Sequence, residues 1–249
     1  MSREQRPRLH DRRPRGIPLR TKLTAAFLFF TVALMGLSIA LNYRATRDAL
    51  TAAAYQTLFA AGSRTAADLD GFLQTNAETI RAAAHLPSLE AYLDLSPEQR
   101  AGCAEEHCVQ QVLSALNHRS EQEHVLSYAL LDVTGRNLVD TQTANIGQDE
   151  SDYTYFQTAL DPDRPYISPV EFAPVTGDAT FYFSYPVRRD SDVGDVLGVL
   201  RVQYSAAILQ ELVSESHALA GEHSFAMLLD ENHLRLADST HPELLFTFV

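Results

Sequence analysis

The sequence lacks the short motifs that identify common enzyme families. It contains no Gly-x-Ser-x-Gly, no phosphate-binding loop, no Gly-x-Gly-x-x-Gly and no His-Glu-x-x-His. Serine-hydrolase, nucleotide and zinc-protease chemistry are therefore without a basis in the sequence. We expect no catalytic residue, no metal site and no cofactor. Low-complexity tracts and short repeats are also absent, and 45% of residues are apolar, enough for one sizeable core and part of a second.

Charge is missing from one stretch of 21 residues, Leu23 to Tyr43. At about 1.5 Å per residue, a helix of this length crosses the roughly 30 Å core of a bilayer. Residues 1–22 carry eight basic and two acidic side chains, whereas the whole chain carries −12 and the remainder about −18. Because basic flanks stay in the cytoplasm, we predict a cytoplasmic arm at 1–22, a transmembrane helix at 23–43 and an outer part beyond Arg44.

A cleaved secretory signal is the alternative, since Ser38-Ile39-Ala40 provides a small-x-small site. Signal cores usually have about 7 to 15 apolar residues, so the length favours an uncleaved anchor in the lipid bilayer. The acidic outer part would be repelled by a polyanion, which excludes nucleic acid as its partner.

Cysteine is scarce, with two residues in 249. Four residues separate Cys103 from Cys108, and we expect a short-loop disulfide because the predicted location is oxidising. Free thiols are one alternative. A metal site completed by His107 and a carboxylate such as Glu105 is the other, with weaker support from the spacing.

Proline is absent between Arg44 and about His85, so the transmembrane helix is predicted to continue outward as a long stalk helix. Its apolar positions follow a three-then-four spacing. They are Leu58, Thr65, Leu69, Phe72, Leu73, Ile80 and Ala84. Such a stripe either covers the sheet of its own domain or forms a parallel dimer seam, and for the first half of the stalk we favour a homodimer.

Beyond the stalk, the periodicity predicts an α+β, PAS-like unit with a five-stranded antiparallel sheet. The predicted strands are 125–132, 137–141, 166–172, 179–187 and 196–204, and the predicted helices are 88–95, 97–117, 152–159 and 205–219. Short loops between the last strands require antiparallel pairing. A further hairpin, 225–229 and 234–238, resembles the first in kind. Because a lone hairpin is marginal in water, we expect 220–249 to be an incomplete second unit, either part of a longer protein or packed on something outside the chain.

The order of these elements resembles the double Cache domain, the extracytoplasmic sensor of bacterial chemoreceptors, sensor histidine kinases and transmembrane cyclases. The segments that carry the resemblance are 17–22, 146–149, 155–159, 165–169, 176–177, 183–187 and 198–200. The resemblance implies a membrane-distal, ligand-binding unit at 44–219, a truncated membrane-proximal half at 220–249 and a place in the bacterial cytoplasmic (inner) membrane. Family members continue into a second span and an output module, and no such segment can be identified in this sequence.

Amino-acid-binding members of that family carry an Arg-x-Trp-Tyr segment and an aspartate after the last strand. The match of Tyr155-Phe156 to the Trp-Tyr pair places Tyr153 at the arginine and Gln203 at the aspartate, so both charges are missing. Unpaired ligand charges are costly in a buried site, so we expect a small uncharged or weakly polar ligand in an aromatic-lined site. The predicted ligand-binding residues are Asp140, Tyr153, Tyr155, Tyr166, Tyr182, Ser184 and Gln203.

Strand alternation adds a prediction about the two faces of segment 179–187. Phe181, Phe183 and Tyr185 should face the long helix, and Tyr182 and Ser184 should face the short helix and the pocket.

The function predicted from the sequence is a non-enzymatic signal-input domain that binds a small molecule and passes a helix displacement across the membrane. A membrane-tethered hydrolase and a stalked interaction adaptor are the alternatives. The first would need titratable groups converging in a cleft, and the second an exposed apolar patch without a pocket.

Overall fold

The structure is a computed structural model that describes residues 18–100, 102–119, 124–160, 164–172, 177–189, 194–215, 220–221 and 223–249. The chain divides into two compact units, residues 1–56 and 57–249. Several predicted segments lie wholly or partly outside the described residues: the basic arm up to residue 17, the turns at 173–176 and 190–193, and the helix end at 216–219.

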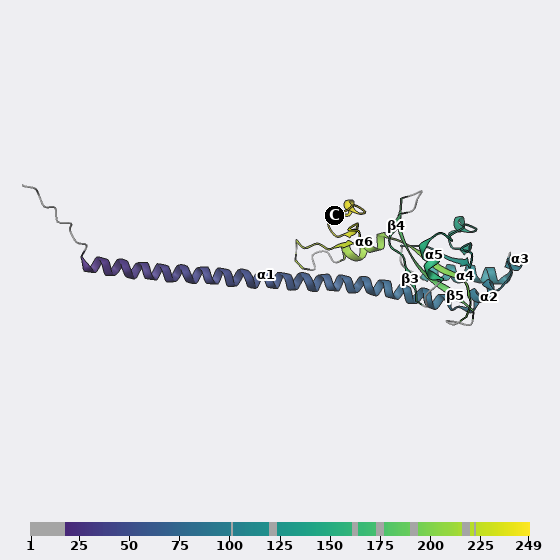
Figure 1. Cartoon of the computed structure of the whole chain (residues 1–249), viewed down its shortest axis with the longest axis horizontal. Coiled ribbons are helices and arrows are strands. Elements are labelled where there is room, and N and C mark those ends of the chain that lie inside the picture. Colours follow the sequence, from purple (N-terminus) through teal and green to yellow (C-terminus); the bar gives the residue numbers. More distant parts are fainter. Residues whose placement is uncertain are drawn as a thin grey trace, which may run out of the picture. The chain divides into compact units, whose positions relative to one another are not determined.

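Helix α1, Leu19–Ala84, contains both the predicted transmembrane stretch and the stalk (Figure 1). Within the described part of the chain, it is the one helix long and apolar enough to cross a membrane. Its large apolar side chains between Leu23 and Tyr43 are exposed. An exposed apolar surface of this length suits contact with lipid, and the helical conformation predicted for 23–43 is confirmed.

Three short helices follow α1: α2 at Pro87–Leu93, α3 at Pro97–Arg100 and α4 at Ala104–Arg119. The helix predicted at 97–117 is interrupted at Gly102, whose φ of 71° is incompatible with a continuous right-handed helix.

The cysteines differ from the prediction, because both are free and no disulfide joins them in the structure. Cys103 precedes α4, and its Sγ accepts a hydrogen bond from the backbone N–H of Glu106 at 3.2 Å. Cys108 lies inside α4 and is exposed.

The unit formed by residues 57–249 contains a large antiparallel sheet. Its strands are β1 at Val125–Asp132, β2 at Asn137–Asp140, β3 at Tyr166–Ile167, β4 at Glu171–Phe172, β5 at Ala179–Arg188 and β6 at Val196–Ser205. The order is β2-β1-β6-β5-β3, and β4 also pairs with β5. The strand predicted at 166–172 is divided in two around Pro169, which has no N–H for a sheet ladder, so the sheet has six strands and not five.

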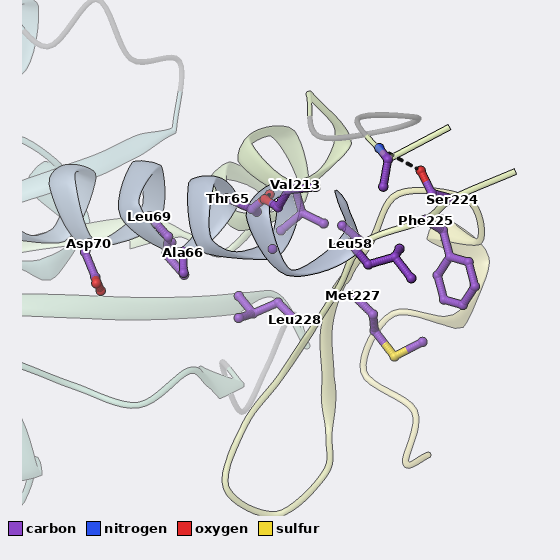
Figure 2. Close-up of a pocket in the computed structure, with 14 residues that line it drawn as sticks. Leu58, Thr65, Ala66, Leu69, Asp70, Val213, Ser224, Phe225, Met227 and Leu228 are labelled. Atoms are coloured by element: carbon purple, nitrogen blue, oxygen red, sulfur yellow. Dashed lines mark hydrogen bonds between the residues drawn. The ribbon is translucent and has the colours of Figure 1, made fainter. Parts of the chain in front are cut away.

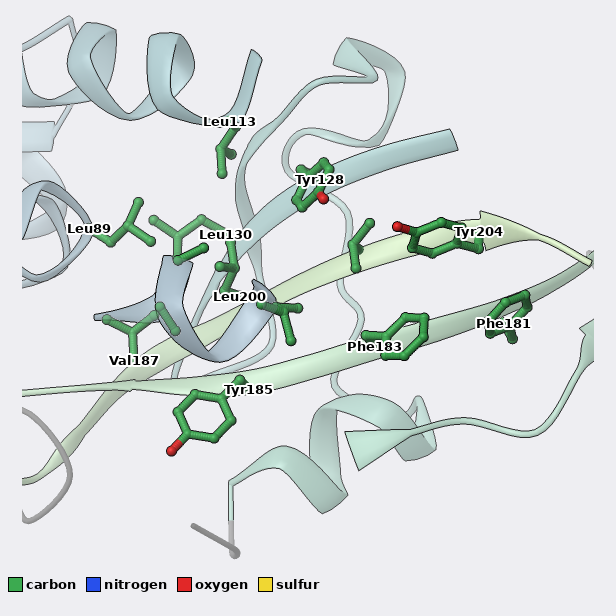
Figure 3. Close-up of a cluster of buried hydrophobic side chains, with 14 of the residues drawn as sticks. Leu89, Leu113, Tyr128, Leu130, Phe181, Phe183, Tyr185, Val187, Leu200 and Tyr204 are labelled. Carbon is green, nitrogen blue, oxygen red and sulfur yellow. The ribbon is translucent and has the colours of Figure 1, made fainter. Parts of the chain in front are cut away.

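One face of the sheet packs on α1, α2 and α4 through a cluster of buried apolar side chains. Figure 3 shows the side chains of this cluster on the sheet, with Leu89 of α2 and Leu113 of α4. The ring of Phe72 on α1 lies edge-on to Phe183, with centroids 6.4 Å apart, and to Tyr204, at 5.7 Å. Tyr204 Oη also donates a hydrogen bond to Oδ1 of Asn76 at 2.7 Å. These contacts confirm the predicted orientation of Phe181, Phe183 and Tyr185, which all belong to this cluster.

Helix α5, Thr154–Ala159, covers the opposite face and confirms the predicted short helix. Tyr155 and Phe156 of α5 pack on Leu131 and Val199 of the sheet. Ser184 Oγ donates to the backbone oxygen of Tyr155 at 2.8 Å. The two faces of β5 therefore serve different layers, as the alternation predicts.

Helix α6, Ala207–Ser214, leads to a second hairpin formed by β7, Met227–Leu229, and β8, Arg235–Asp238. The side chain of Gln210 on α6 bonds both the N–H and the carbonyl of Asp238, each at 2.8 Å. Ala237 is fully buried in the main cluster. Part of this hairpin thus packs within the chain, while the predicted incomplete second unit at 220–249 stays a prediction.

Candidate functional site

A cavity of about 150 Å³ lies on the α5 side of the sheet. Four of the predicted ligand-binding residues line it: Tyr153, Tyr155, Tyr182 and Gln203. The remaining lining residues are Asn145, Gln148, Glu150, Glu171, Phe172, Thr180 and Arg201. The cavity therefore combines an aromatic side with charged and polar groups from β4, β5, β6 and the segment before α5.

Three tyrosines form the aromatic side. Tyr153 stacks on Tyr155 with ring centroids 5.2 Å apart, and Tyr155 stacks on Tyr182 at 4.3 Å. Gln203 Nε2 donates a hydrogen bond to Tyr182 Oη at 3.2 Å. Burial raises the pKa of both Tyr155 and Tyr182, so these phenols are neutral at physiological pH. Together they give the cavity a rigid, amphipathic wall.

Arg201 lies at the base of the cavity, in the middle of the sheet. It stands opposite Ala129 of β1 and Ser184 of β5 and is almost fully buried. Its Nε and Nη2 donate to the two carboxylate oxygens of Glu150, both at 3.0 Å. Nη2 also donates to Asp140 Oδ2 at 3.1 Å, and Nη1 to Ser127 Oγ at 2.6 Å. All three guanidinium nitrogens are therefore engaged.

Glu150 is as fully bonded as Arg201. Besides the arginine, it accepts hydrogen bonds from Tyr155 Oη at 2.5 Å and Asn137 Nδ2 at 2.8 Å. Burial alone would raise the pKa of Glu150, but the bonds and charge of Arg201 lower it overall. Burial likewise opposes the charge of Arg201, and Glu150 more than compensates, so the pKa of the arginine is raised. The group is an ionised, hydrogen-bonded cluster, which is the form in which buried charges are tolerated.

Glu171 is different, because its carboxylate has no hydrogen-bond or ion-pair partner among the described residues. It lies on β4 opposite Thr180 and is half-buried at the cavity. Burial raises the pKa of its carboxyl group. A partly desolvated carboxylate without a partner is a group that a ligand can satisfy.

Three predicted site residues do not line the cavity. Asp140 is buried behind Arg201, Ser184 is buried beneath α5, and Tyr166 packs half-buried beside the same layer. The first two hold the wall and base of the cavity through their bonds to Arg201 and Tyr155. Asp140 and Ser184 therefore position Arg201 and Tyr155, respectively.

The charged residues at the cavity were not among the predicted site residues. The sequence predicts an aromatic site with polar tips, and the structure adds Arg201, Glu150 and Glu171 to it. One signal was present, because Arg201 interrupts an apolar strand, and a charge in a buried strand requires a partner. Its partner Glu150 lies 51 positions away along the chain, where no local pattern marks it.

A second, larger cavity of about 280 Å³ lies between residues 58–70 of α1, Val213 of α6, Ala220 and residues 224–228 (Figure 2). Its lining is mostly apolar, with Leu58, Phe225 and Met227 among the larger side chains. A ligand site usually combines apolar walls with a few convergent polar groups. The cavity beneath α5 meets that description better and is the candidate site.

Comparisons with known proteins give no match to a protein-family model and none to a curated sequence. Solved structures do match. The ligand-binding domain of the Campylobacter jejuni chemoreceptor Tlp3, in complex with 4-methylisoleucine, has a TM-score of 0.59 at 18% identity, covering 79% of this chain and 75% of that one. The sensor domain of the V. cholerae histidine kinase DctB has a TM-score of 0.60 at 16% identity, with 76% and 68% covered.

The ligand-binding domain of the Pseudomonas aeruginosa amino acid chemoreceptor PctC, in complex with GABA, has a TM-score of 0.56 at 17% identity, covering 77% of this chain and 76% of that one. All three are input domains of receptors. The chain thus has the fold of chemoreceptor and histidine-kinase sensor domains, as the resemblance to the Cache domain predicts.

Proposed function

We propose that this chain is a membrane-anchored extracytoplasmic sensor that binds a small molecule in the cavity beneath α5. The observation that carries the proposal is the cavity itself, which joins a stacked tyrosine wall to a buried ion cluster. It lies between the short helix and the sheet, where the sensor hypothesis places a pocket. The Tlp3 and PctC domains were solved with 4-methylisoleucine and GABA, and ligands of that small size are compatible with a cavity of about 150 Å³.

The proposed topology follows from the charge asymmetry. Residues 1–22 lie in the cytoplasm, 23–43 cross the bacterial inner membrane, and 44–219 form the stalk and the membrane-distal sensor unit outside it. Residues 220–249 begin a membrane-proximal unit. The excess of arginine and lysine before the apolar stretch supports this orientation.

Ligand occupancy would reach α1 through the sheet. Arg201 and Gln203 face the cavity, whereas Tyr204 of the same strand bonds Asn76 of α1. A shift of β6 on binding therefore acts directly on the long helix, which can bias a two-state arrangement. We further propose that α1 mediates a homodimer, because large apolar side chains such as Leu58 are exposed on it.

A thermal-shift screen of the full chain in lipid nanodiscs against a metabolite library tests the proposal. A ligand at a hundred times its dissociation constant stabilises the folded state by about 2.7 kcal/mol. We expect Tyr153→Ala to weaken that shift, since Tyr153 is part of the wall and exposed enough for the fold to tolerate its loss. Tyr55→Ala, on the exposed surface of α1, is the control. A library without any stabilising compound would refute the proposal, as would a ligand that binds Tyr153→Ala with unchanged affinity.

A further inference from the structure

The charges around the cavity are unbalanced. Its lining contains one cation, Arg201, and two carboxylates, Glu150 and Glu171, while Asp140 stands directly behind the arginine. All three nitrogens of Arg201 already donate to protein oxygens. Four of its five N–H groups are used by these bonds, so a ligand carboxylate would find at most one N–H on Nη1 and would lie beside the buried carboxylates of Glu150 and Asp140, whose charges repel it.

A positive group meets the opposite situation. Glu171 has no partner among the described residues, and burial disfavours its charged form, as the raised pKa of its carboxyl group reflects. A ligand cation beside this carboxylate would restore the interactions that it loses by leaving water. The buried cluster of Arg201, Glu150 and Asp140 has a net negative charge, which would also attract a ligand cation.

The tyrosine wall also suits a cation. Aromatic ring faces and phenol oxygens both attract ammonium groups, and a stacked, rigid wall needs no rearrangement on binding. The Tyr182 ring already lies with its centroid 5.9 Å from the guanidinium carbon of Arg201. Tyr153, at the outer end of the stack, is 41% exposed and accessible to a ligand.

Metal ions fit the site less well than organic cations do. Among the described residues, no group of three or more His, Cys, Asp or Glu side chains could hold a metal ion. Hard metal ions require six or more oxygen ligands, whereas an ammonium group needs one carboxylate and an aromatic face.

We propose that the ligand is a small organic cation, an amine or ammonium compound that needs no carboxylate of its own, held between Glu171 and the tyrosine wall. This inference rests on the proposed sensor function and names the ligand class of that same cavity. It differs from the uncharged or weakly polar ligand expected from the sequence, because Glu171 was not among the predicted site residues.

The test compares ligands that share one carbon skeleton and differ in charge. Isobutylamine, isobutyramide and isobutyrate are titrated into the full chain in nanodiscs, together with a panel of primary to quaternary amines and diamines, and binding is measured by calorimetry and thermal shift. Magnesium, calcium and sodium chlorides form a separate arm. We expect amines to bind, and the matched amide, acid and metal ions not to bind.

Two variants locate the recognition. Glu171→Gln keeps the shape of the side chain and removes its charge, and we expect at least a tenfold loss of amine affinity. Glu231→Gln removes one charge from the exposed turn of the second hairpin, outside the cavity, and should leave affinity unchanged. Tyr153→Leu, which removes the outer ring, should also weaken amine binding and provides a second test should Glu171→Gln fold poorly.

The outcomes separate the two proposals. If the acid, the amide or a metal ion binds as well as the amines, or if Glu171→Gln keeps full amine affinity, the cation assignment is wrong while a sensor of another ligand class stands. If the metabolite library yields no ligand of the cavity, the proposed function fails together with the assignment.

Discussion

The two hairpins of this chain share one backbone plan in different surroundings. In the first, Asp132 Oδ1 accepts the N–H groups of Thr134 and Arg136, and in the second, Asp230 Oδ1 accepts those of Asn232 and Leu234. Each hairpin continues into a short 3₁₀ helix, at Thr143–Asn145 and Pro242–Leu244. The chain then returns to form an isolated bridge with the residue just before the second strand, Asp149 with Arg136 and Phe248 with Leu234. Local side chains thus specify the same hairpin twice.

The difference between the hairpins lies beyond their own residues. The first pairs with β6, which brings Arg201 against Asp140. Asp238 occupies the matching place in the second, where its nearest cation is Arg235 of the same strand, 3.5 Å away. Nε and Nη1 of that arginine are buried without hydrogen-bond partners among the described residues. A hairpin is thus encoded locally, whereas the charged site depends on a strand from elsewhere in the chain.

Replacement of the two arginines should give the largest contrast. Arg201→Met leaves Glu150 and Asp140 buried without their common cation, and we expect a loss of about 3–5 kcal/mol in the free energy of unfolding. Arg235→Met removes a poorly bonded arginine and should cost about 1 kcal/mol or less. Urea denaturation of the full chain in nanodiscs, followed by circular dichroism, measures both.

Arg201→Lys serves as the control, because it keeps the charge and loses the paired hydrogen bonds. Its decrease in the free energy of unfolding should lie between the decreases of the other two variants. Equal losses for Arg201→Met and Arg235→Met would show that the buried cluster is not what distinguishes the first hairpin.

The turns of the two hairpins provide the next contrast. Gly135 has a φ of 85°, and an added Cβ would lie 2.6 Å from the backbone of Ser151, so Gly135→Ala should cost about 2–3 kcal/mol. His233 has a φ of 63° in the matching turn. A non-glycine residue in this region is strained by about 1–2 kcal/mol, and His233→Gly should therefore stabilise by about 0.5–1 kcal/mol after the added entropy of the unfolded chain.

Urea midpoints measure both turn variants. His233→Ala, which keeps a Cβ at the same backbone angles, should show none of the gain expected for His233→Gly. A neutral Gly135→Ala would mean that the loop around Ser151 moves freely.

The sequence predicts the features that depend on neighbouring residues and misses those that depend on residues far apart in the chain. The alternation in β5 correctly assigned Phe183 to the helix face and Tyr182 to the cavity face, because the period of a strand is a local property. The hairpins were located for the same reason. The ion cluster escaped prediction, since Glu150 and Arg201 meet only after β1 and β6 have paired.

Acid should destabilise both hairpins. Arg201 lowers the pKa of Glu150 against the effect of burial, and backbone hydrogen bonds from Thr240 and His241 lower that of Asp238 against the same effect. A carboxyl group whose pKa is lower in the folded state stabilises the fold above its unfolded pKa, and this contribution is lost as pH falls. We expect the free energy of unfolding to fall by about 1–3 kcal/mol between roughly pH 5 and 3.

Unfolding free energies across this pH range, for the parent chain and for Glu150→Gln and Asp238→Asn, separate the two contributions. Each variant should flatten the pH dependence. A slope unchanged in both would contradict the assignment of acid sensitivity to these carboxylates.

The smallest effects should come from a matched pair of hydroxyl groups. The backbone N–H of Tyr128 donates to Thr141 Oγ1 at 2.9 Å, and that of Ala226 donates to Ser239 Oγ at 2.9 Å. Thr141→Val and Ser239→Ala each leave one N–H without its acceptor, and we expect losses of about 0.5–1.5 kcal/mol from urea midpoints.

Thr143→Val, on an exposed residue of the first 3₁₀ helix, is the control and should be neutral. Equal losses at Thr141 and Ser239 would mean that each hairpin is held by its own local bonds. Because Tyr128 is fully packed in the core whereas Ala226 is half-buried, the loss at Thr141 should be the larger of the two. A larger loss at Ser239 would mean that the second hairpin, without a third strand, depends more on this single bond than the first does.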